Sequence, residues 1–333
     1  MGASIHESNT LVGAGGWAYF HVPGRESLRA YSSSFNFVEL NSTYYEYPNI
    51  RSVSGWRSRV PQKFEFAVRC HKEIVQAFRR GKGDRLDNVV GKMEEICRTL
   101  DANILTILVP KGSGIREKSL VKGLEHVTST FNAGKTRIAV ELRGGAPSPV
   151  LRTMQDNDAI HCVDISNEQP AYNSGILYSR VFGKGQDNIY QFDDDEIKDI
   201  AKSATAPKFE KSILAFHGVR MFGDAARLKS FLQTGKFLQV TGQTGLDSLA
   251  EVLKEDAPFP ASKRELVARQ GWKLFDLTVE KRVRASTILS RLPERTYGNA
   301  RDVIASLEPW VSKEIQSPQP ARDNTRSGSA SQT

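Results

Sequence analysis

The sequence predicts an α/β fold in which a (β/α)8 TIM-type barrel is followed by a small all-helical module. Between residues 11 and 235, eight short apolar runs rich in β-branched residues alternate with longer stretches of helical pattern. Strands that alternate with helices pair in parallel through crossovers, and eight such units in about 225 residues match the size of a closed barrel. A change of pattern near residue 241 predicts that a separate module begins there.

The eight expected strands cover 11–15, 37–40, 64–68, 104–109, 137–142, 159–163, 176–181 and 212–216. An open doubly wound sheet is the main alternative, and it usually carries a glycine-rich phosphate loop at its first turn. Here "VGAGGW" supplies only part of the GxGxxG pattern, because Ala18 stands at the third glycine position. The glycines therefore indicate a tight turn, and no nicotinamide or flavin cofactor is expected.

The pattern after the barrel predicts helices. Ser248 with Glu251 and Ser262 with Glu265 have the spacing of capping boxes, and two further helices are expected over 278–292 and 297–307. The residues from 311 onward are rich in Ser, Pro, Gln and Arg and poor in large apolar side chains. We therefore expect a flexible N-terminus (1–10), a barrel (11–240), a helical module (246–308) and a disordered tail (311–333).

Composition limits the class of protein. The chain has 333 residues, of which 39% are hydrophobic, enough for a sizeable core. Its longest apolar run, near 104–110, is shorter than the roughly 18 to 20 residues that span a bilayer, and no signal peptide is recognisable, so we expect a soluble cytoplasmic protein without a membrane partner. Three separated cysteines exclude a disulfide framework and a CxxC metal site. The net charge of +8 fits an anionic partner but is also common on soluble enzymes.

Ionisable side chains follow several of the expected strands. Active sites of (β/α)8 enzymes lie at the C-terminal mouth of the barrel, where Glu39 and Asn41 share one side of their strand by the period-two rule and Thr43 begins the next loop. Other strand ends contribute Arg69, His71, Glu141, Arg143, Asp164, Arg180 and His217, and Trp17 follows the first strand. A buried charge is costly unless it is paired, so these residues form either an ion-pair network or a ligand site.

Each of these residues also has a structural interpretation. Glu39 paired with Arg143 or Arg180 would be a structural salt bridge, an interpretation as good as catalysis. Asp164 fits the cap of the next helix, and Trp17 fits packing at the barrel rim. The acidic run at 192–196 is typical of a helix start, where the macrodipole favours carboxylates, rather than of a metal site.

Several motifs together resemble a known family. "GAGGWAYF", "FNFVELNSTYYEYP", "FEFAVRCHKEI", "RIAVELR" and "YSRVFG" resemble, in order and spacing, the YecE-like TIM-barrel family, domain of unknown function 72, over roughly 11–235. The resemblance implies a barrel whose Glu39, Glu141 and Arg180 line a pocket with Trp17 and Asn41, but it implies no activity. Phe182 stands where many members have histidine, so a catalytic histidine is not carried over directly. The segments "FPASKRELVARQ" and "LSRLPERTYGNARDVI" resemble domain of unknown function 2795, which implies an interaction module.

Three functions are compatible with these residues. The first is an enzyme of hydrolase or lyase type acting on a phosphorylated or sugar-like anion, with Glu39, Glu141, Asp164 and His217 as catalytic groups and Trp17, Asn41, Thr43, Arg143 and Arg180 binding the substrate. In a variant of it, Glu39, Glu141, Asp164 and His217 hold a divalent metal ion. The second is a nucleic-acid binding or nuclease-like protein, favoured by the charge and by the basic runs 72–85 and 280–286. The third is a non-catalytic ligand-binding barrel with a protein partner for the helical module.

Overall fold

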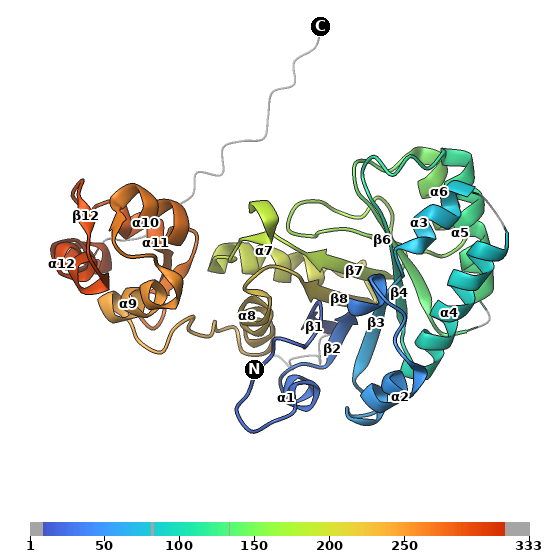
Figure 1. Ribbon diagram of the computed structural model, residues 1–333, viewed down its shortest axis with the longest axis horizontal. Coiled ribbons are helices and arrows are strands. Elements are labelled where there is room, and N and C mark those ends of the chain that lie inside the picture. The colour runs from blue at the N-terminus through green and yellow to red at the C-terminus, as the bar shows by residue number, and fades with distance from the viewer. Residues whose placement is uncertain (1–8, 81–82, 133, 317–333) are drawn as a thin grey trace, which may run out of the picture. The chain divides into compact units, whose positions relative to one another are not determined.

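The computed structural model describes residues 9–80, 83–132 and 134–316, with side chains up to residue 310 (Figure 1). Residues 1–8 of the expected flexible N-terminus (1–10) and residues 317–333 of the expected disordered tail (311–333) lie outside these described residues. The chain divides after Gln239 into two compact units. Each unit is therefore described by itself.

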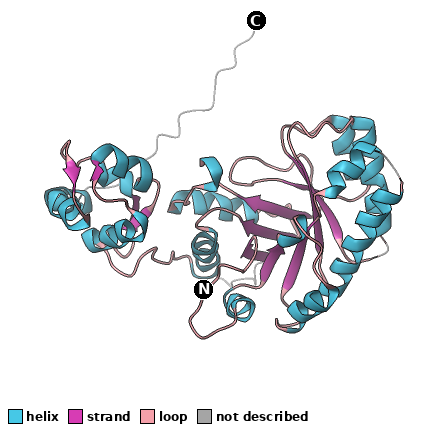
Figure 2. Ribbon diagram, viewed as in Figure 1, coloured by secondary structure: helices cyan, strands magenta, loops and turns pink. Residues whose placement is uncertain are grey.

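The first unit is a barrel of eight parallel strands (Figure 2). The strands are β1 (Thr10–Ala14), β2 (Phe37–Leu40), β3 (Glu65–Arg69), β4 (Ile104–Val109), β5 (Arg137–Leu142), β6 (Ile160–Cys162), β7 (Ile176–Val181) and β8 (Lys211–Phe216). Their order is β6-β5-β4-β3-β2-β1-β8-β7, and a parallel bridge between Val163 and Ser179 joins the two end strands. The backbone amide of Arg180 also donates to the carbonyl of Val163 at 3.1 Å. These contacts close the ring and confirm the TIM-type barrel.

Helices follow every strand except β6 in the described part of the barrel. They are α1 (Ser27–Ser34), α2 (Ile50–Ser58), α3 (Glu73–Arg80), α4 (Asp84–Leu100), α5 (Glu117–Phe131), α6 (Ser148–Asp156), α7 (Asp194–Ala204) and α8 (Met221–Thr234), with short 3-10 turns at η1 (Ser42–Tyr44) and η2 (Gln186–Asn188). Asp193 and Glu196 form a capping box at the start of α7. The acidic run at 192–196 is therefore a helix start, as its pattern predicts.

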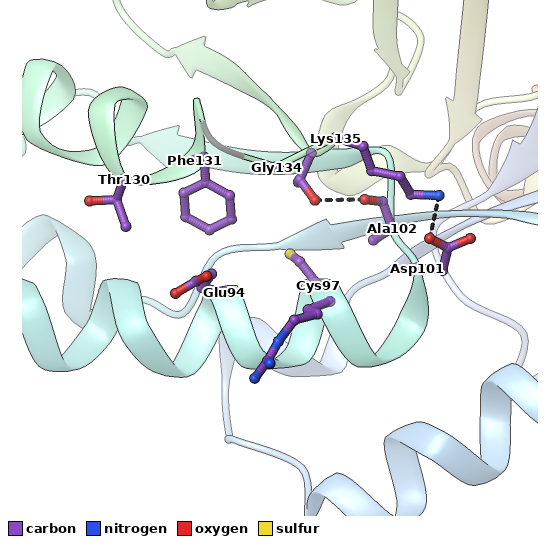
Figure 3. Close-up of a pocket in the computed structure, with 10 residues that line it drawn as sticks. Glu94, Cys97, Asp101, Ala102, Thr130, Phe131, Gly134 and Lys135 are labelled. Atoms are coloured by element: carbon purple, nitrogen blue, oxygen red, sulfur yellow. Dashed lines mark hydrogen bonds and ion pairs between the residues drawn. The ribbon is translucent and has the colours of Figure 1, made fainter.

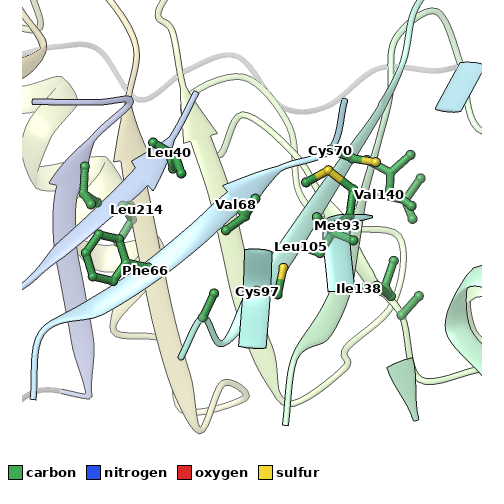
Figure 4. Packing of buried hydrophobic residues seen from close by; sticks show 14 of the residues in the cluster. Leu40, Phe66, Val68, Cys70, Met93, Cys97, Leu105, Ile138, Val140 and Leu214 are labelled. Carbon is green, nitrogen blue, oxygen red and sulfur yellow. The ribbon is translucent and has the colours of Figure 1, made fainter. Parts of the chain in front are cut away.

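The barrel has apolar side chains on both faces of its strands. Outward-facing residues such as Phe66, Val68 and Leu105 belong to the same buried cluster as Met93 and Cys97 of α4 (Figure 4). A second cluster fills the interior: Phe37, Ala67, Ile104, Ala139, Ile160, Cys162, Tyr178, Ile213 and Ala215. Parallel strands covered on both faces read as nearly continuous apolar runs, which is why the sequence predicts them well. The three cysteines are free and buried.

The second unit is mainly helical but is not all-helical, so that part of the prediction is wrong. It contains α9 (Gly245–Asp256), α10 (Lys263–Gln270), α11 (Ala285–Leu289) and α12 (Ala300–Gln316). Two short antiparallel pairs join β10 (Leu274–Asp276) to β11 (Arg282–Arg284) and β9 (Ala261–Ser262) to β12 (Thr296–Tyr297). The helix expected over 278–292 is thus a turn, a strand and a short helix.

Side-chain hydrogen bonds explain which helix starts were predicted correctly. The Ser262–Glu265 capping box is confirmed at α10. Ser248, in contrast, lies buried inside α9, where its Oγ accepts from the amide of Asp276 at 2.8 Å instead of capping a helix.

The expected tail from 311 begins inside α12, which continues to Gln316. Among the described residues, no helix combines the length and apolarity that a membrane span requires.

Candidate active site

A buried ion pair lies at the C-terminal mouth of the barrel. Glu39 points into the barrel from β2 and has no exposed surface. Arg180 of β7 donates from Nε to both carboxylate oxygens of Glu39 at 3.1 Å. The hydroxyl of Tyr178, two residues before Arg180 on the same face of β7, donates to Glu39 Oε2 at 2.5 Å. Glu39 is therefore held by three hydrogen bonds from two neighbouring side chains.

The ion pair continues toward the surface as a chain of alternating charges. Arg180 Nη1 donates to Glu141 Oε2 on β5. Glu141 Oε1 in turn accepts a hydrogen bond from Arg143 Nε at 2.6 Å. The side chains of Glu39 and Arg180 are almost completely buried, whereas that of Arg143 is 46% exposed. The network thus reaches from the barrel interior to solvent.

The pKa values in this network follow from the pairing. Burial alone favours the neutral form of Glu39, but the charge of Arg180 outweighs it and holds the pKa of this carboxyl well below its usual range. Burial likewise disfavours the charge of Arg180, but Glu39 and Glu141 raise its pKa above the usual value. Glu39 is therefore ionised near neutral pH, and a carboxylate with so low a pKa is a poor general base there.

His217 lies beside this network after the end of β8. Its ring stacks on Phe182 with centroids 4.9 Å apart. Asn41 Nδ2 lies 3.3 Å from His217 Nδ1, and because an amide nitrogen only donates, Nδ1 is the acceptor and Nε2 carries the proton. Nε2 lies 3.3 Å from Glu39 Oε1, a contact with an ionised carboxylate that falls short of well-aligned hydrogen-bond geometry. Burial lowers the pKa of His217, which keeps the imidazole neutral at pH 7.

Glycine is required at residue 15 by the close approach of this histidine. A Cβ atom at Gly15 would lie 2.3 Å from two ring atoms of His217 and 2.6 Å from Asn41 Nδ2. Asn41 Nδ2 also donates to the carbonyl of Gly15 at 3.0 Å. The "VGAGGW" glycines thus mark close packing of the backbone against the site, in addition to a turn.

Unpartnered polar atoms are concentrated in this region. Among the described residues, seven buried side-chain nitrogen or oxygen atoms lack a hydrogen-bond partner. Four of them belong to the mouth: Asn41 Oδ1, Arg69 Nε, Thr106 Oγ1 and His217 Nε2. Most buried polar groups in proteins are paired, so such a concentration needs a specific explanation.

Three residues assigned to the site from sequence have structural contacts. Thr43 is buried, and its Oγ1 donates to the carbonyls of Leu40 at 2.9 Å and Arg69 at 2.6 Å. Asp164 accepts from the backbone amides of Ser166, Phe182 and Gly183 at 3.0, 2.9 and 3.2 Å, so it fastens two loops rather than capping a helix. Trp17 packs edge-on against Trp56 at 5.6 Å.

Two residues near the site, Tyr178 and Phe182, were not assigned to it from sequence, and Arg69, which the sequence places at the mouth, was given no role there. Tyr178 donates to Glu39, and its place two residues before Arg180 is the signal that could have identified it. The guanidinium carbons of Arg143 and Arg180 lie 5.2 and 5.3 Å from the ring centroid of Phe182. Arg69 interacts electrostatically with Arg180 from the end of β3.

The expected metal-ligand set is not assembled. No group of three or more His, Cys, Asp or Glu side chains that could hold a metal ion occurs within residues 9–80, 83–132 and 134–316. The oxygens of Glu39 and Glu141 accept from arginines, and those of Asp164 accept largely from backbone amides. These carboxylates are held by arginines and backbone amides and do not converge on one point with a third ligand, so the residues do not fit the metal variant.

A cavity of about 290 Å³ lies elsewhere, beside the C-terminal parts of α4 and α5 (Figure 3). Its lining includes Cys97, Asp101 and Lys135, and the last two form an ion pair. Asp101 precedes β4 and Lys135 precedes β5, so the cavity lies at the N-terminal end of the strands, which in TIM barrels serves stability. Burial raises the pKa of Cys97 well above its usual value, which keeps the thiol protonated at neutral pH. The cavity is therefore separate from the charged residues at the C-terminal mouth.

Comparison with known proteins supports the same fold. The family model described as "Protein of unknown function DUF72" matches residues 11–244. A solved DUF72 family protein of Enterococcus faecalis has a TM-score of 0.55 and 18% identity, covering 68% of this chain and 98% of that chain. One of Thermotoga maritima has a TM-score of 0.54 and 17% identity, covering 67% and 99%. No curated protein matches the chain. Because the family model matches well over half of the sequence, the chain belongs to the DUF72 family.

Proposed function

We propose that the chain is an enzyme of hydrolase or lyase type that acts on a small phosphorylated or sugar-like anion at the C-terminal mouth of the barrel. The observation that carries this proposal is the set of four unpartnered polar atoms around the Glu39–Arg180–Glu141 network. Leaving a buried polar atom without a partner costs about 1–3 kcal/mol, and a ligand that supplied the partners would remove that cost. The mouth therefore has the hydrogen-bonding groups of a binding site as well as the charges of an ion-pair network.

The proposed roles follow from burial and protonation. Glu141 is the general base, since its side chain is 12% exposed and it is the carboxylate of the network nearer to solvent. His217 is a neutral hydrogen-bond donor to the substrate through Nε2, whose contact with Glu39 is poorly aligned, and Asn41 accepts through Oδ1. Glu39 does not exchange protons; it is a positioning residue that fixes Arg180 and Tyr178.

The test is an activity screen with matched variants. The wild type is assayed against phosphate monoesters and glycosides, beside Glu141→Gln and the exposed control Glu125→Gln on α5. General acid–base catalysis contributes typically 10²–10⁴-fold, so Glu141→Gln is expected to lower kcat by at least about 100-fold while Glu125→Gln leaves it unchanged. Equal turnover by wild type and Glu141→Gln, with both proteins folded by circular dichroism, would remove Glu141 from the mechanism.

The nucleic-acid alternative has less support from the basic runs that suggested it. In the run 280–286, buried Arg282 lies 3.4 Å from Asp276, and Arg284 donates to the carbonyl of Trp272 at 2.9 Å. In the run 72–85, Arg79 donates to the carbonyl of Ser113. These side chains make contacts within their own unit, which favours the small-molecule proposal. Short DNA or RNA belongs in the screen, and salt-sensitive binding unaffected by Glu141→Gln would support the alternative.

For the C-terminal unit we propose the interaction role that its resemblance to domain of unknown function 2795 implies. Its core cluster, including Leu249, Phe275 and Leu307, is formed by residues of this unit alone, and Val279 in the turn between β10 and β11 is 67% exposed. A chain ending at residue 239 is expected to keep the barrel's ligand response, because every residue of the proposed site precedes that point. The predicted cytoplasmic location likewise remains part of the proposal.

A further inference from the structure

Arg69 carries a positive charge that forms no ion pair with the carboxylates of the network. It ends β3 and is only half-buried, yet none of the N–H groups of its guanidinium donates a hydrogen bond within the described residues. No carboxylate of those residues lies within ion-pair distance of it. An arginine has five such donors and stays charged at any physiological pH, so this guanidinium has donors available for a ligand.

The guanidinium is nevertheless fixed in place. Its central carbon lies 3.8 Å from the centroid of the Tyr44 ring, which provides a cation–π platform. The backbone around it is tied down, because Thr43 Oγ1 donates to the carbonyl of Arg69 and the amide of Lys72 donates to the carbonyl of Tyr44 at 3.0 Å. A side chain held this way loses little further entropy when it binds a ligand.

A second polar group lies next to it. Arg69 and Thr106 are register partners on β3 and β4, so their side chains are neighbours on the inner face of the barrel. Thr106 Oγ1 is buried and interacts with the Tyr178 hydroxyl, but it makes no hydrogen bond of ordinary geometry. The hydroxyl and the guanidinium together present several donors at one place.

The other arginines of the mouth are already neutralised. Arg180 pairs with Glu39 and Glu141, and Arg143 pairs with Glu141. The mouth thus contains three arginines and two carboxylates of the network. Arg69 is the arginine whose positive charge is not paired with either carboxylate. The remaining carboxylate of the region, Asp164, takes its hydrogen bonds from Ser166, Asn167 and backbone amides, so it does not offset this charge by pairing.

We infer that Arg69, lying on Tyr44 and next to the hydroxyl of Thr106, forms a subsite for an oxyanion, either a phosphate or a carboxylate group of the ligand. The planar guanidinium binds such groups through two parallel N–H···O bonds, which an ammonium group does not reproduce. The subsite deepens the proposed function, since it places the anionic group of the substrate. Arg143 and Arg180, the arginines assigned to the anion from sequence, instead organise Glu141 and Glu39.

The experiment measures binding of simple anions without turnover. Inorganic phosphate, sulfate and acetate are titrated calorimetrically at constant ionic strength into the wild type, Arg69→Gln, Arg69→Lys and Arg51→Gln, the last removing an exposed arginine of α2. We expect Arg51→Gln to bind phosphate like the wild type, Arg69→Gln at least tenfold more weakly, and Arg69→Lys at an intermediate level. Stronger binding of phosphate and sulfate identifies a tetrahedral anion, and stronger binding of acetate identifies a carboxylate.

Controls separate this inference from misfolding and from the enzymatic proposal. Without anion, Arg69→Gln should melt at no lower temperature than the wild type, because it removes an unpaired cation. Tyr44→Leu provides a second variant, which keeps the charge of Arg69 but removes the aromatic ring on which its guanidinium lies. Arg143→Gln is titrated beside these variants. Phosphate binding to Arg69→Gln within twofold of wild type, or binding lost in Arg143→Gln but kept in Arg69→Gln, overturns the subsite. Glu141→Gln should retain phosphate binding, because Glu141 is not part of the subsite. Phosphate binding that depends on Arg69, without turnover of any compound, would therefore contradict the enzymatic function but support the subsite.

Discussion

Replacing Glu39 with glutamine should destabilise the barrel, in addition to any effect on ligand binding. Glu39 is completely buried, and its partner Arg180 is 2% exposed. Removing one member of a buried ion pair costs about 3–5 kcal/mol, because the other charge stays buried without its partner. Arg180 keeps its hydrogen bond to Glu141, so we expect the lower end of this range, about 3 kcal/mol.

The effect is measurable by thermal unfolding. For a domain of 150–250 residues, 1 kcal/mol shifts Tm by about 2–4 °C, so Glu39→Gln should lower the Tm of the barrel by about 6–12 °C. The matched control is Glu65→Gln, which removes a carboxylate 2.7 Å from Lys211 in an ion pair whose side chains are 21% and 32% exposed. Partly exposed pairs contribute up to about 1 kcal/mol, so the control should shift Tm by only about 2–4 °C. A smaller loss in Glu39→Gln than in Glu65→Gln would refute the reasoning from burial.

The pH dependence provides a second readout of the same group. The pKa of Glu39 is lowered on folding, because the attraction to Arg180 outweighs the effect of burial. The stabilisation that the ionised carboxylate of Glu39 gives the folded state is therefore complete above the usual pKa of 4.5, and it is lost as the pH falls through the lowered pKa. Glutamine does not titrate. The difference in unfolding free energy between wild type and Glu39→Gln should therefore be constant above about pH 5 and shrink at lower pH. A difference that grows on acidification would contradict this sign.

Three further substitutions test single contacts. Tyr178→Phe removes the 2.5 Å donor to Glu39 and should cost about 1–3 kcal/mol in urea unfolding; a neutral effect would mean that Arg180 alone satisfies the carboxylate. Gly15→Ala places a Cβ 2.3 Å from His217 and should cost about 1–3 kcal/mol while shifting the imidazole signals in NMR spectra; unchanged signals would refute the close approach. Ser262→Ala removes the capping box of α10 and should cost about 1 kcal/mol, seen as faster hydrogen exchange in that helix but not in the barrel.

Much of the barrel could be predicted because its strands are covered on both faces. The expected runs 104–109, 137–142 and 176–181 coincide with β4, β5 and β7. The C-terminal unit was less predictable, since β11 comprises only Arg282–Arg284, too short for a clear alternating pattern, and pairs with a strand that is itself only three residues long. Ser248 matched a capping-box spacing, but its hydroxyl is used by the amide of Asp276, which is a tertiary contact.

The sequence predicts which side chains of the site point into the barrel mouth, but it does not predict which carboxylate pairs with which arginine. The period of two correctly places Glu39 inside the barrel, and strand ends supply Glu141, Arg180 and His217. Which carboxylate pairs with which arginine depends on closure of the ring, because Glu39 and Arg180 are 141 residues apart in the sequence. The free charge of Arg69 is likewise visible only after every other pair is assigned.

These pairings explain why the strand "FVEL" ends in a carboxylate and polar groups. Glu39 has no exposed surface, so its effect on a ligand is exerted through Arg180 and Tyr178. A substitution at Glu39 therefore changes stability and site geometry together and does not separate a structural from a catalytic role. Arg69 and Glu141 are closer to solvent, and only one of them, Glu141, is paired. Anion binding that depends on Arg69 and turnover that depends on Glu141 would thus establish a working site, whatever the stability of Glu39→Gln.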